Sequence, residues 1–235
     1  MALFTISDLH LPLGVDKPMD IFGKSWENYV EKIEEEWKKN VKNGDLVVMP
    51  GDFSWAMYLE ESKKDFQFLN DLPGEKILLK GNHDYWWGTM NKMRKFLAEE
   101  GFSGIDFLQN KSILYKNIAI CGTRGWSYIG FNSPKTQEDE TIFRREVLRL
   151  EMSLSDAKAK NPDEIIVFMH YPPILPECQD SEFSRLLKRY DVKRCVYGHI
   201  HGINRKNAVT GVVDGIEYML VSCDYLGFSP VKLCE

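Results

Sequence analysis

The first 84 residues alternate apolar runs with amphipathic stretches, and this alternation constrains the fold more than any other feature. Residues 2–6, 46–49 and 76–80 have the length and composition of buried strands. Residues 26–41, after a possible N-cap at Ser25, and residues 57–69 predict helices between those strands. Strands that alternate with helices pair in parallel through right-handed crossovers. The sequence therefore predicts an α/β fold with three parallel strands at its start.

Each of these three strands ends in a cluster of polar residues. Asp8 and His10 follow the first strand, Asp52 follows the second within Gly51-Asp52, and the third leads into Gly81-Asn82-His83-Asp84. Ligands of open α/β sheets bind at the carboxyl ends of the strands. We expect the three clusters to converge at one edge of one sheet.

Two later strands end in further polar clusters. Residues 165–169 form an apolar run that ends at His170, and residues 194–197 lead into Gly198-His199-Ile200-His201. Before them, residues 112–121 read as two short antiparallel strands. Polar clusters therefore follow five predicted strands, and they include all five histidines of the chain.

The side-chain types in these clusters indicate a metal site. Carboxylates, imidazoles and an amide, without a thiolate, suit Mn²⁺, Fe²⁺ or Zn²⁺ better than Ca²⁺ or a structural zinc ion. Six or seven such groups exceed what one tetrahedral ion needs, whereas two ions that share a carboxylate would use them all. Residues at positions i and i+2, as in Asp8-x-His10, also point to the same side of an extended chain.

The motifs Asp-x-His, Gly-Asp, Gly-Asn-His-Asp, His and Gly-His-x-His, in this order from Asp8 to His201, resemble those of the calcineurin-like metallophosphoesterase superfamily. The resemblance implies a two-sheet β-sandwich flanked by helices, with a dinuclear metal site at the carboxyl edge of the strands. We expect residues 1–235 to form one domain of this kind.

The resemblance also implies a role for each residue. One metal ion would be held by Asp8, His10, Asp52 and His201, and the other by Asp52, Asn82, His170 and His199. His83 would face the substrate and act as the proton donor, with Asp84 fixing its tautomer. Asp84 has an alternative role as the cap of a helix that begins near Thr89.

These roles predict a metal-dependent phosphoesterase. A metal-activated hydroxide would attack phosphorus while His83 protonates the departing alkoxide, without a covalent enzyme intermediate. A small phosphomonoester is the expected substrate. The alternatives are a phosphodiesterase acting on cyclic nucleotides or nucleic acid, and a non-catalytic metal-binding scaffold. The complete set of ligands and the presence of His83 favour the enzyme over the scaffold.

One arginine and four tryptophans near the motifs have alternative roles in substrate binding or in structure. Arg124 would bind a substrate phosphate or pair with a surface carboxylate. Ser/Thr protein phosphatases carry a phosphate-binding arginine soon after the Gly-Asp motif, whereas this chain continues with Phe53-Ser54-Trp55, which argues against that class. The nearby tryptophans would line a pocket or pack in the core, and these are Trp55, Trp86, Trp87 and Trp126.

Composition narrows the partners and the location. The net charge of −5 gives no electrostatic footprint for nucleic acid. The five scattered cysteines contain no CxxC pair, so a disulfide framework or a structural zinc site is not expected. The chain lacks an apolar run of about 18 residues and a signal-peptide pattern, so we expect no membrane segment and a cytoplasmic location. The sequence indicates no oligomeric state.

Overall fold

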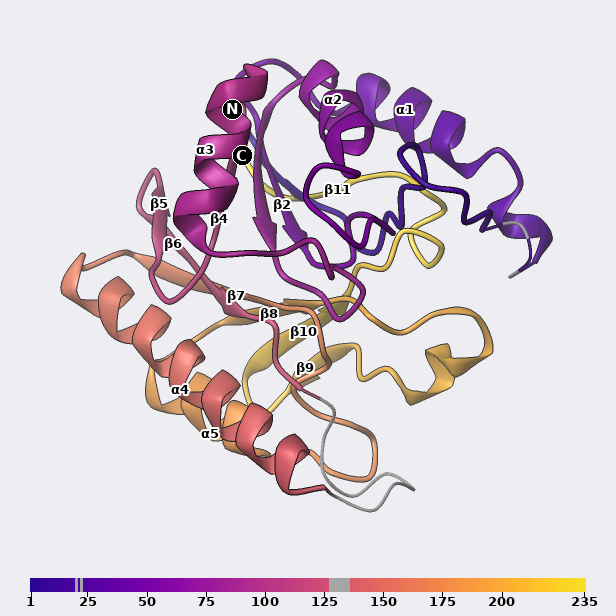
Figure 1. Cartoon of the computed structure of the whole chain (residues 1–235). Helices are drawn as coiled ribbons and strands as arrows, with labels where there is room; N and C mark the ends of the chain where they lie inside the picture. The colour runs from indigo at the N-terminus through magenta and orange to yellow at the C-terminus, as the bar shows by residue number, and fades with distance from the viewer. Residues whose placement is uncertain (20, 22, 127–135) are drawn as a thin grey trace. The chain divides into compact units, whose positions relative to one another are not determined.

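The computed structural model describes residues 1–19, 21, 23–126 and 136–235. The chain divides into two compact units (Figure 1). Unit 1 comprises Met1–Phe107 and Val221–Glu235, and unit 2 comprises Leu108–Leu220. Each unit contains one β-sheet and its own buried apolar core.

The sheet of unit 1 has the order β11-β1-β2-β3-β4. The strands are β1 (Leu3–Thr5), β2 (Leu46–Pro50), β3 (Glu75–Leu79), β4 (Ile105–Phe107) and β11 (Val231–Cys234). Strands β1 to β4 pair in parallel, and β11 pairs antiparallel with β1 at the edge. The predicted parallel arrangement of the first three strands is confirmed.

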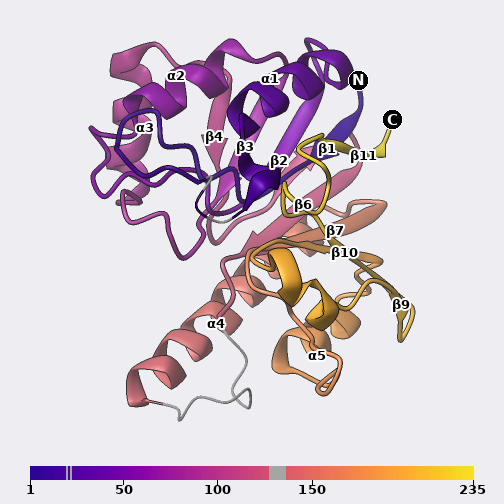
Figure 2. The same ribbon diagram turned by 90° about the vertical axis from the view of Figure 1, so that its right-hand side faces the viewer.

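Three helices cover this sheet. They are α1 (Tyr29–Asn40), α2 (Lys63–Asp71) and α3 (Met90–Glu100). Their buried side chains, such as Trp37 and Phe66, share one apolar core with Val47 and Leu78 of the strands. Figure 2 shows α1 and α2 lying along the strands of this sheet. Burial of this shared face stabilises the helices more than their intrinsic propensity does.

The boundaries of two helices and the number of strands differ from the sequence prediction. A 3₁₀ turn, Lys24–Trp26, precedes α1, so Ser25 does not cap this helix. Helix α2 begins at Lys63 rather than at residue 57, because the Glu61 carboxylate accepts hydrogen bonds from the backbone of residues 57 and 58 and holds them in a turn. Strands β4 and β11 were not predicted, because runs of three or four residues show no periodicity.

The sheet of unit 2 has the order β5-β6-β7-β8-β10-β9. The strands are β5 (Ile113–Tyr115), β6 (Ile118–Thr123), β7 (Glu164–Met169), β8 (Arg194–Tyr197), β9 (Gly211–Val213) and β10 (Ile216–Leu220). The four central strands are parallel, and β5 and β9 are antiparallel edges. The helices α4 (Gln137–Ala159) and α5 (Glu182–Arg189) pack on this sheet through one core, and the 3₁₀ helix η3 (Gly202–Asn207) follows β8.

The predicted fold class is confirmed as mixed α/β, with two multistranded sheets flanked by helices. Parallel strands that alternate with helices make up most of each sheet. Among the described residues, no helix combines the length and the apolar character that crossing a lipid bilayer requires.

Asp65 of α2 ties this helix to the loops that leave β1 and β2. The Asp65 carboxylate accepts hydrogen bonds from the Leu13 amide (2.8 Å) and from the Ser54 hydroxyl. The side chain is fully buried. Burial raises the pKa of Asp65 to about 7, and the hydrogen bonds act in the opposite direction.

This raised pKa predicts how stability depends on pH. The folded state binds the proton of Asp65 more tightly than the unfolded chain does. The protonated Asp65 therefore contributes fully to the free energy of unfolding below about pH 4, and this contribution is lost as pH rises through about 7. Relative to Asp65→Asn, the free energy of unfolding of the wild type should fall by about 1.4 kcal/mol per pH unit within this window. Urea unfolding from pH 4 to 8 measures it, with the exposed Asp71→Asn as control. Parallel wild-type and Asp65→Asn curves would contradict the expectation.

Candidate metal centre

The loops that leave β1 and β2 run side by side and carry three of the predicted metal ligands. The Asp8 amide donates to the Gly51 carbonyl, and the His10 amide donates to the Asp52 carbonyl, both at 3.0 Å. These bonds continue the pairing of β1 with β2 beyond the ends of the strands. They place Asp8, His10 and Asp52 on adjacent backbones at the carboxyl edge of the sheet.

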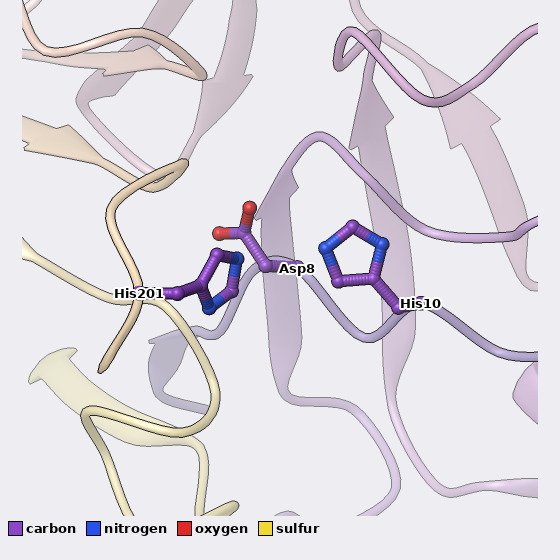
Figure 3. Close-up of side chains that lie close together, drawn as sticks. All are labelled: Asp8, His10 and His201. Carbon is purple, nitrogen blue, oxygen red and sulfur yellow. The ribbon is translucent and has the colours of Figure 1, made fainter. Parts of the chain in front are cut away.

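The side chains of these three residues converge. Asp8 and His10 offer possible ligand atoms within 4.8 Å of each other (Figure 3). The His10 Nε2 atom lies 3.8 Å from the Asp52 Oδ2 atom. All three residues are at most 3% exposed. Buried carboxylates are costly unless cations or hydrogen bonds compensate them, so this arrangement suits a bound cation.

The backbone is strained at four of the predicted ligands. Asp8, His10, Asp52 and His199 have φ angles of 59°, 47°, 53° and 70°. Residues other than glycine rarely adopt this left-handed region. Such strain clusters at functional sites, where the surrounding structure holds it in place. The strain therefore supports a functional role for these positions independently of their side-chain chemistry.

The loop after β3 brings Gly81 and His83 next to Asp52. The Asp52 Oδ1 atom accepts a hydrogen bond of 2.8 Å from the His83 amide. A Cβ atom at Gly81 would lie 2.1 Å from the same Oδ1 atom, so only glycine permits this approach. Asn82 and His83 are half-buried, within reach of a small molecule.

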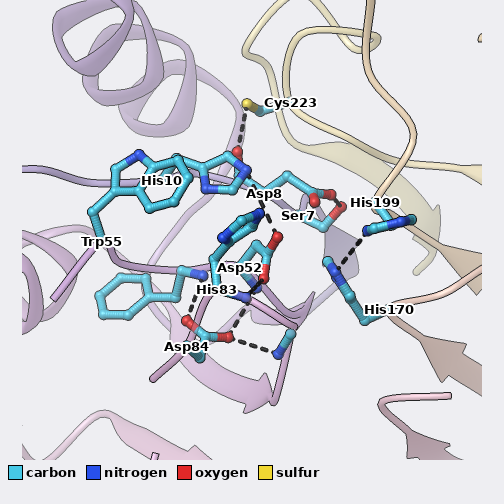
Figure 4. A network of polar contacts seen from close by, with 12 residues as sticks. Ser7, Asp8, His10, Asp52, Trp55, His83, Asp84, His170, His199 and Cys223 are labelled. Atoms are coloured by element: carbon cyan, nitrogen blue, oxygen red, sulfur yellow. Dashed lines mark hydrogen bonds and ion pairs between the residues drawn. The ribbon is translucent and has the colours of Figure 1, made fainter. Parts of the chain in front are cut away.

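The Asp84 carboxylate joins the loops after β2 and β3 through hydrogen bonds (Figure 4). Its fully buried carboxylate accepts hydrogen bonds from five donors, which are the amides of Gly81 (2.7 Å), Asp52 (2.9 Å), Phe53 (2.9 Å) and Ser54 (3.4 Å) and the indole of Trp86 (3.1 Å). Burial raises the pKa of Asp84 to about 6, while the backbone donors act in the opposite direction. Five N–H donors around one carboxylate favour its ionised form, which offers only acceptors.

Neither role predicted for Asp84 matches this geometry. The sequence predicted that Asp84 fixes the His83 ring, but its carboxylate points back to backbone N–H groups that the strand ends leave in need of acceptors. The alternative role as a helix cap belongs to Thr89, whose hydroxyl accepts from the Lys92 amide at 3.3 Å. Asp84 thus holds the loops on which Asp52, Asn82 and His83 lie.

Unit 2 gathers the remaining predicted ligands at the ends of β7 and β8. The His199 Nδ1 atom lies 3.2 Å from the His170 Nε2 atom, as Figure 4 shows. The Gly198 amide donates to the His170 carbonyl at 3.2 Å, which joins the two loops. His201 follows on the second loop, immediately before η3. Two imidazole nitrogens that converge on one point are suited to a shared metal ion.

Arg124 lies beside this histidine pair at the end of β6. Its carbonyl accepts hydrogen bonds from the amides of His170 and Tyr171. Its guanidinium packs over the Trp126 ring at 4.6 Å and lies 3.6 Å from Glu146. The carboxylate predicted as one alternative partner is therefore present, although it is buried rather than on the surface. The phosphate-binding role of Arg124 stays a prediction.

The aromatic residues near the motifs take different places. Trp86 is buried in the core of unit 1, and Trp87 packs against that core, as the core-packing hypothesis expects. Trp55 instead contacts the rings of His10 and His83. Tyr171, which the sequence analysis missed, lies with its ring centroid 4.2 Å from that of His199. Its position directly after His170 was the available signal.

The donors in each unit fit divalent metal ions. Unit 1 supplies two buried carboxylates and one imidazole, and unit 2 supplies an imidazole pair, without a cysteine among them. Borderline divalent ions prefer such mixed oxygen and nitrogen donors. Hydrogen bonds from the loop backbones orient these donors, as supporting contacts do in metal sites.

Comparison with known proteins gives a family and a fold. A model of the calcineurin-like phosphoesterase family matches residues 1–202, which confirms the resemblance stated from the motifs. That range contains every predicted ligand. A search of curated proteins found no match.

Solved structures share this fold at low sequence identity. Phosphopantetheinyl hydrolase from Mycobacterium tuberculosis aligns with a TM-score of 0.57 at 13% identity, over 99% of this chain and 95% of that chain. A protein of unknown function from Aquifex aeolicus aligns with a TM-score of 0.51 at 17% identity, over 98% of this chain and 95% of that chain. A protein from Thermus thermophilus aligns with a TM-score of 0.55 at 11% identity, over 99% of this chain and 97% of that chain. At these identities the likeness concerns the fold alone.

The hydrogen bonds to the Asp84 carboxylate predict that Asp84→Asn lowers the stability of the protein strongly. Asp84→Asn replaces one acceptor oxygen with an NH₂ group that faces backbone N–H donors in a buried site. We expect a loss of about 2–4 kcal/mol in the free energy of unfolding, because a buried charge network would be broken. Denaturant unfolding measures this loss. Asp106→Asn, which breaks the exposed pair with Arg94, is the matched control and should cost at most about 1 kcal/mol. Equal losses of unfolding free energy in the two variants would contradict a structural role of the Asp84 hydrogen bonds.

Proposed function

We infer the function of this chain from its family, because the chain belongs to the calcineurin-like phosphoesterases, whose model matches residues 1–202. Membership in this family supports a metal-dependent phosphoester hydrolase. We propose that its substrate is a small phosphomonoester and that residues 1–235 act as one catalytic domain. The observation that carries the proposal is the convergence of Asp8, His10 and Asp52 on a strained, buried backbone at the carboxyl edge of a sheet.

We propose the two sets of metal ligands that the family motifs imply. One ion would be bound by Asp8, His10, Asp52 and His201, and the other by Asp52, Asn82, His170 and His199. The distance of 3.8 Å between His10 and Asp52 and that of 3.2 Å between His170 and His199 support the grouping within each unit. When bound, two divalent ions, proposed as Mn²⁺, Fe²⁺ or Zn²⁺, would lower the pKa of water and neutralise charge on phosphate oxygens.

His83 is the proposed proton donor. Its amide is bonded to the carboxylate of Asp52, so the donor and the proposed bridging ligand keep a fixed relation. Its ring is half-buried and does not need to bind a metal ion, because the other four histidines serve that purpose in the proposal. A protonated imidazole can then give a proton to the departing alkoxide of the substrate.

The preference for a small monoester rests on the surroundings of the site. Arg124, with a buried Nε atom that lacks a hydrogen-bond partner among the described residues, is the proposed ligand of a substrate phosphate oxygen. The net charge of −5 disfavours nucleic acid as a substrate.

The five cysteines, all within the described part of the chain, are free thiols, which supports the proposed cytoplasmic location.

The first test of this proposal is metal-dependent hydrolysis. With Mn²⁺ supplied, the protein should hydrolyse an aryl phosphate faster than a bis-aryl phosphate, and removal of metal by a chelator should abolish the activity. Asp52→Asn should lose bound metal and activity together, by at least about 100-fold in kcat. Elemental analysis and initial rates measure both effects, with Asp106→Asn as the control that keeps metal and activity.

Two outcomes would overturn parts of this proposal. An Asp52→Asn variant that retains two ions would exclude the bridging role. Folded wild-type protein that is inactive across a panel of metals and esters would favour the scaffold alternative. The panel should set mono- and diesters of metabolites side by side, with cyclic nucleotides and a phosphopantetheinyl compound included because a structural neighbour is named for hydrolysing the latter. A clear preference for diesters would favour the phosphodiesterase alternative.

The proton-donor role of His83 has its own signature. His83→Asn should keep both metal ions yet lower kcat by about 10²–10⁴-fold for esters with poor leaving groups, such as alkyl phosphates. Esters with good leaving groups, such as nitrophenyl phosphate, need little protonation and should be slowed much less. Rates across a series of leaving groups, together with metal analysis, measure the difference. Equal slowing across the series would exclude the role.

A further inference from the structure

Trp55 lies against two histidine rings that come from different loops of unit 1 (Figure 4). Its ring is stacked with His10, with centroids 4.6 Å apart and planes at 21°. Its ring is tilted against His83, with centroids also 4.6 Å apart and planes at 59°. The two imidazoles are themselves 5.5 Å apart in an edge-to-face arrangement. The three rings thus form one contiguous aromatic cluster.

The position of Trp55 is fixed by contacts of its backbone and its indole. Its amide donates to the Leu11 carbonyl at 3.1 Å, which ties it to the loop after β1. Its indole Nε1 donates to the sulfur of the buried Met19 at 3.0 Å. The ammonium of Lys17 lies 5.1 Å from the centroid of the ring. The indole therefore offers a rigid surface to whatever packs on it.

The His83 ring packs on this surface. The Asp84 carboxylate, which would otherwise orient it, is committed to backbone amides and to Trp86. The amide of His83 donates to Asp52, but a hydrogen bond of the backbone does not by itself fix χ1 and χ2 of the side chain. Ring-on-ring packing with preferred geometries restricts both angles.

We propose that Trp55 is a positioning residue that fixes the His83 ring for proton donation. This inference rests on the proposed role of His83. A general acid acts only within hydrogen-bond reach of the leaving oxygen, and displacement by about 1 Å can cost about 100-fold in rate. The contact with His10 offers a competing explanation, in which Trp55 supports only the metal ligand. The two explanations predict different kinetics.

Kinetics with Trp55→Leu separate the two explanations. Positioning of His83 predicts a kcat loss of about 10–100-fold for alkyl phosphates, a loss below about 3-fold for nitrophenyl phosphate, and unchanged metal content. Trp55→Phe, which keeps a smaller ring, should show the same selectivity with a smaller loss, and it carries the comparison if the leucine variant does not fold. Support of His10 alone predicts metal loss and equal slowing of all esters, which would overturn the proposal.

A double-mutant cycle identifies His83 as the residue through which Trp55 acts. In the His83→Asn background, Trp55→Leu should slow alkyl phosphate hydrolysis by less than about 3-fold. A full additional loss would overturn the proposal. If His83→Asn itself slows all esters equally, the proton-donor role fails. If His83→Asn is selective for leaving groups but Trp55→Leu is not, only the positioning role fails.

A structural readout does not depend on turnover. In metal-free protein, the ring-proton NMR signals of His10 and His83 should shift on Trp55→Leu, because the ring current of the indole is removed. Trp87→Leu, which removes an indole that packs against the core, is the matched control and should leave the His83 signals and the leaving-group dependence unchanged. An unshifted His83 signal in Trp55→Leu would overturn the proposal.

Discussion

The hydrogen bonds to the Asp84 carboxylate are the interaction on which the arrangement of the unit 1 site depends. Two parallel strands end next to each other, and their loops turn away with N–H groups that need acceptors. One buried carboxylate accepts from both loops. Asp52 and His83 therefore keep a fixed relation, and the hydrogen bond between them, at 2.8 Å, follows from this arrangement.

Parallel pairing explains why the candidate ligands of each unit meet at one edge. In unit 1, hydrogen bonds between the loops after β1 and β2 extend beyond the sheet, and the backbone is left-handed at Asp8, His10 and Asp52. In unit 2, the loops after β6, β7 and β8 are joined through the carbonyls of Arg124 and His170. In the proposed metal site, the joined loops would orient the candidate ligands before an ion binds.

The neighbours of the histidines support the roles proposed for them. His170 and His199 face each other at 3.2 Å, as ligands of one ion would. His10 faces Asp52, while His83 packs on Trp55 and uses its backbone amide to bind Asp52. This arrangement is consistent with the proposed phosphoester hydrolysis, in which binding of metal and donation of a proton need separate histidines.

The sequence by itself determined the α/β class, the parallel order of the first three strands, the positions of all five motifs and the family, because these depend on local periodicity and on short motifs. Only the tertiary structure decided which donors Asp84 binds, since its partners at Asp52 and Phe53 lie 32 and 31 residues away. The same holds for the short edge strand β11, which pairs with β1 from the far end of the chain, for the burial of Glu146 beside Arg124, and for the contact of Trp55 with two histidines. Contacts between distant residues follow from how strands and loops pack, and no local pattern encodes them.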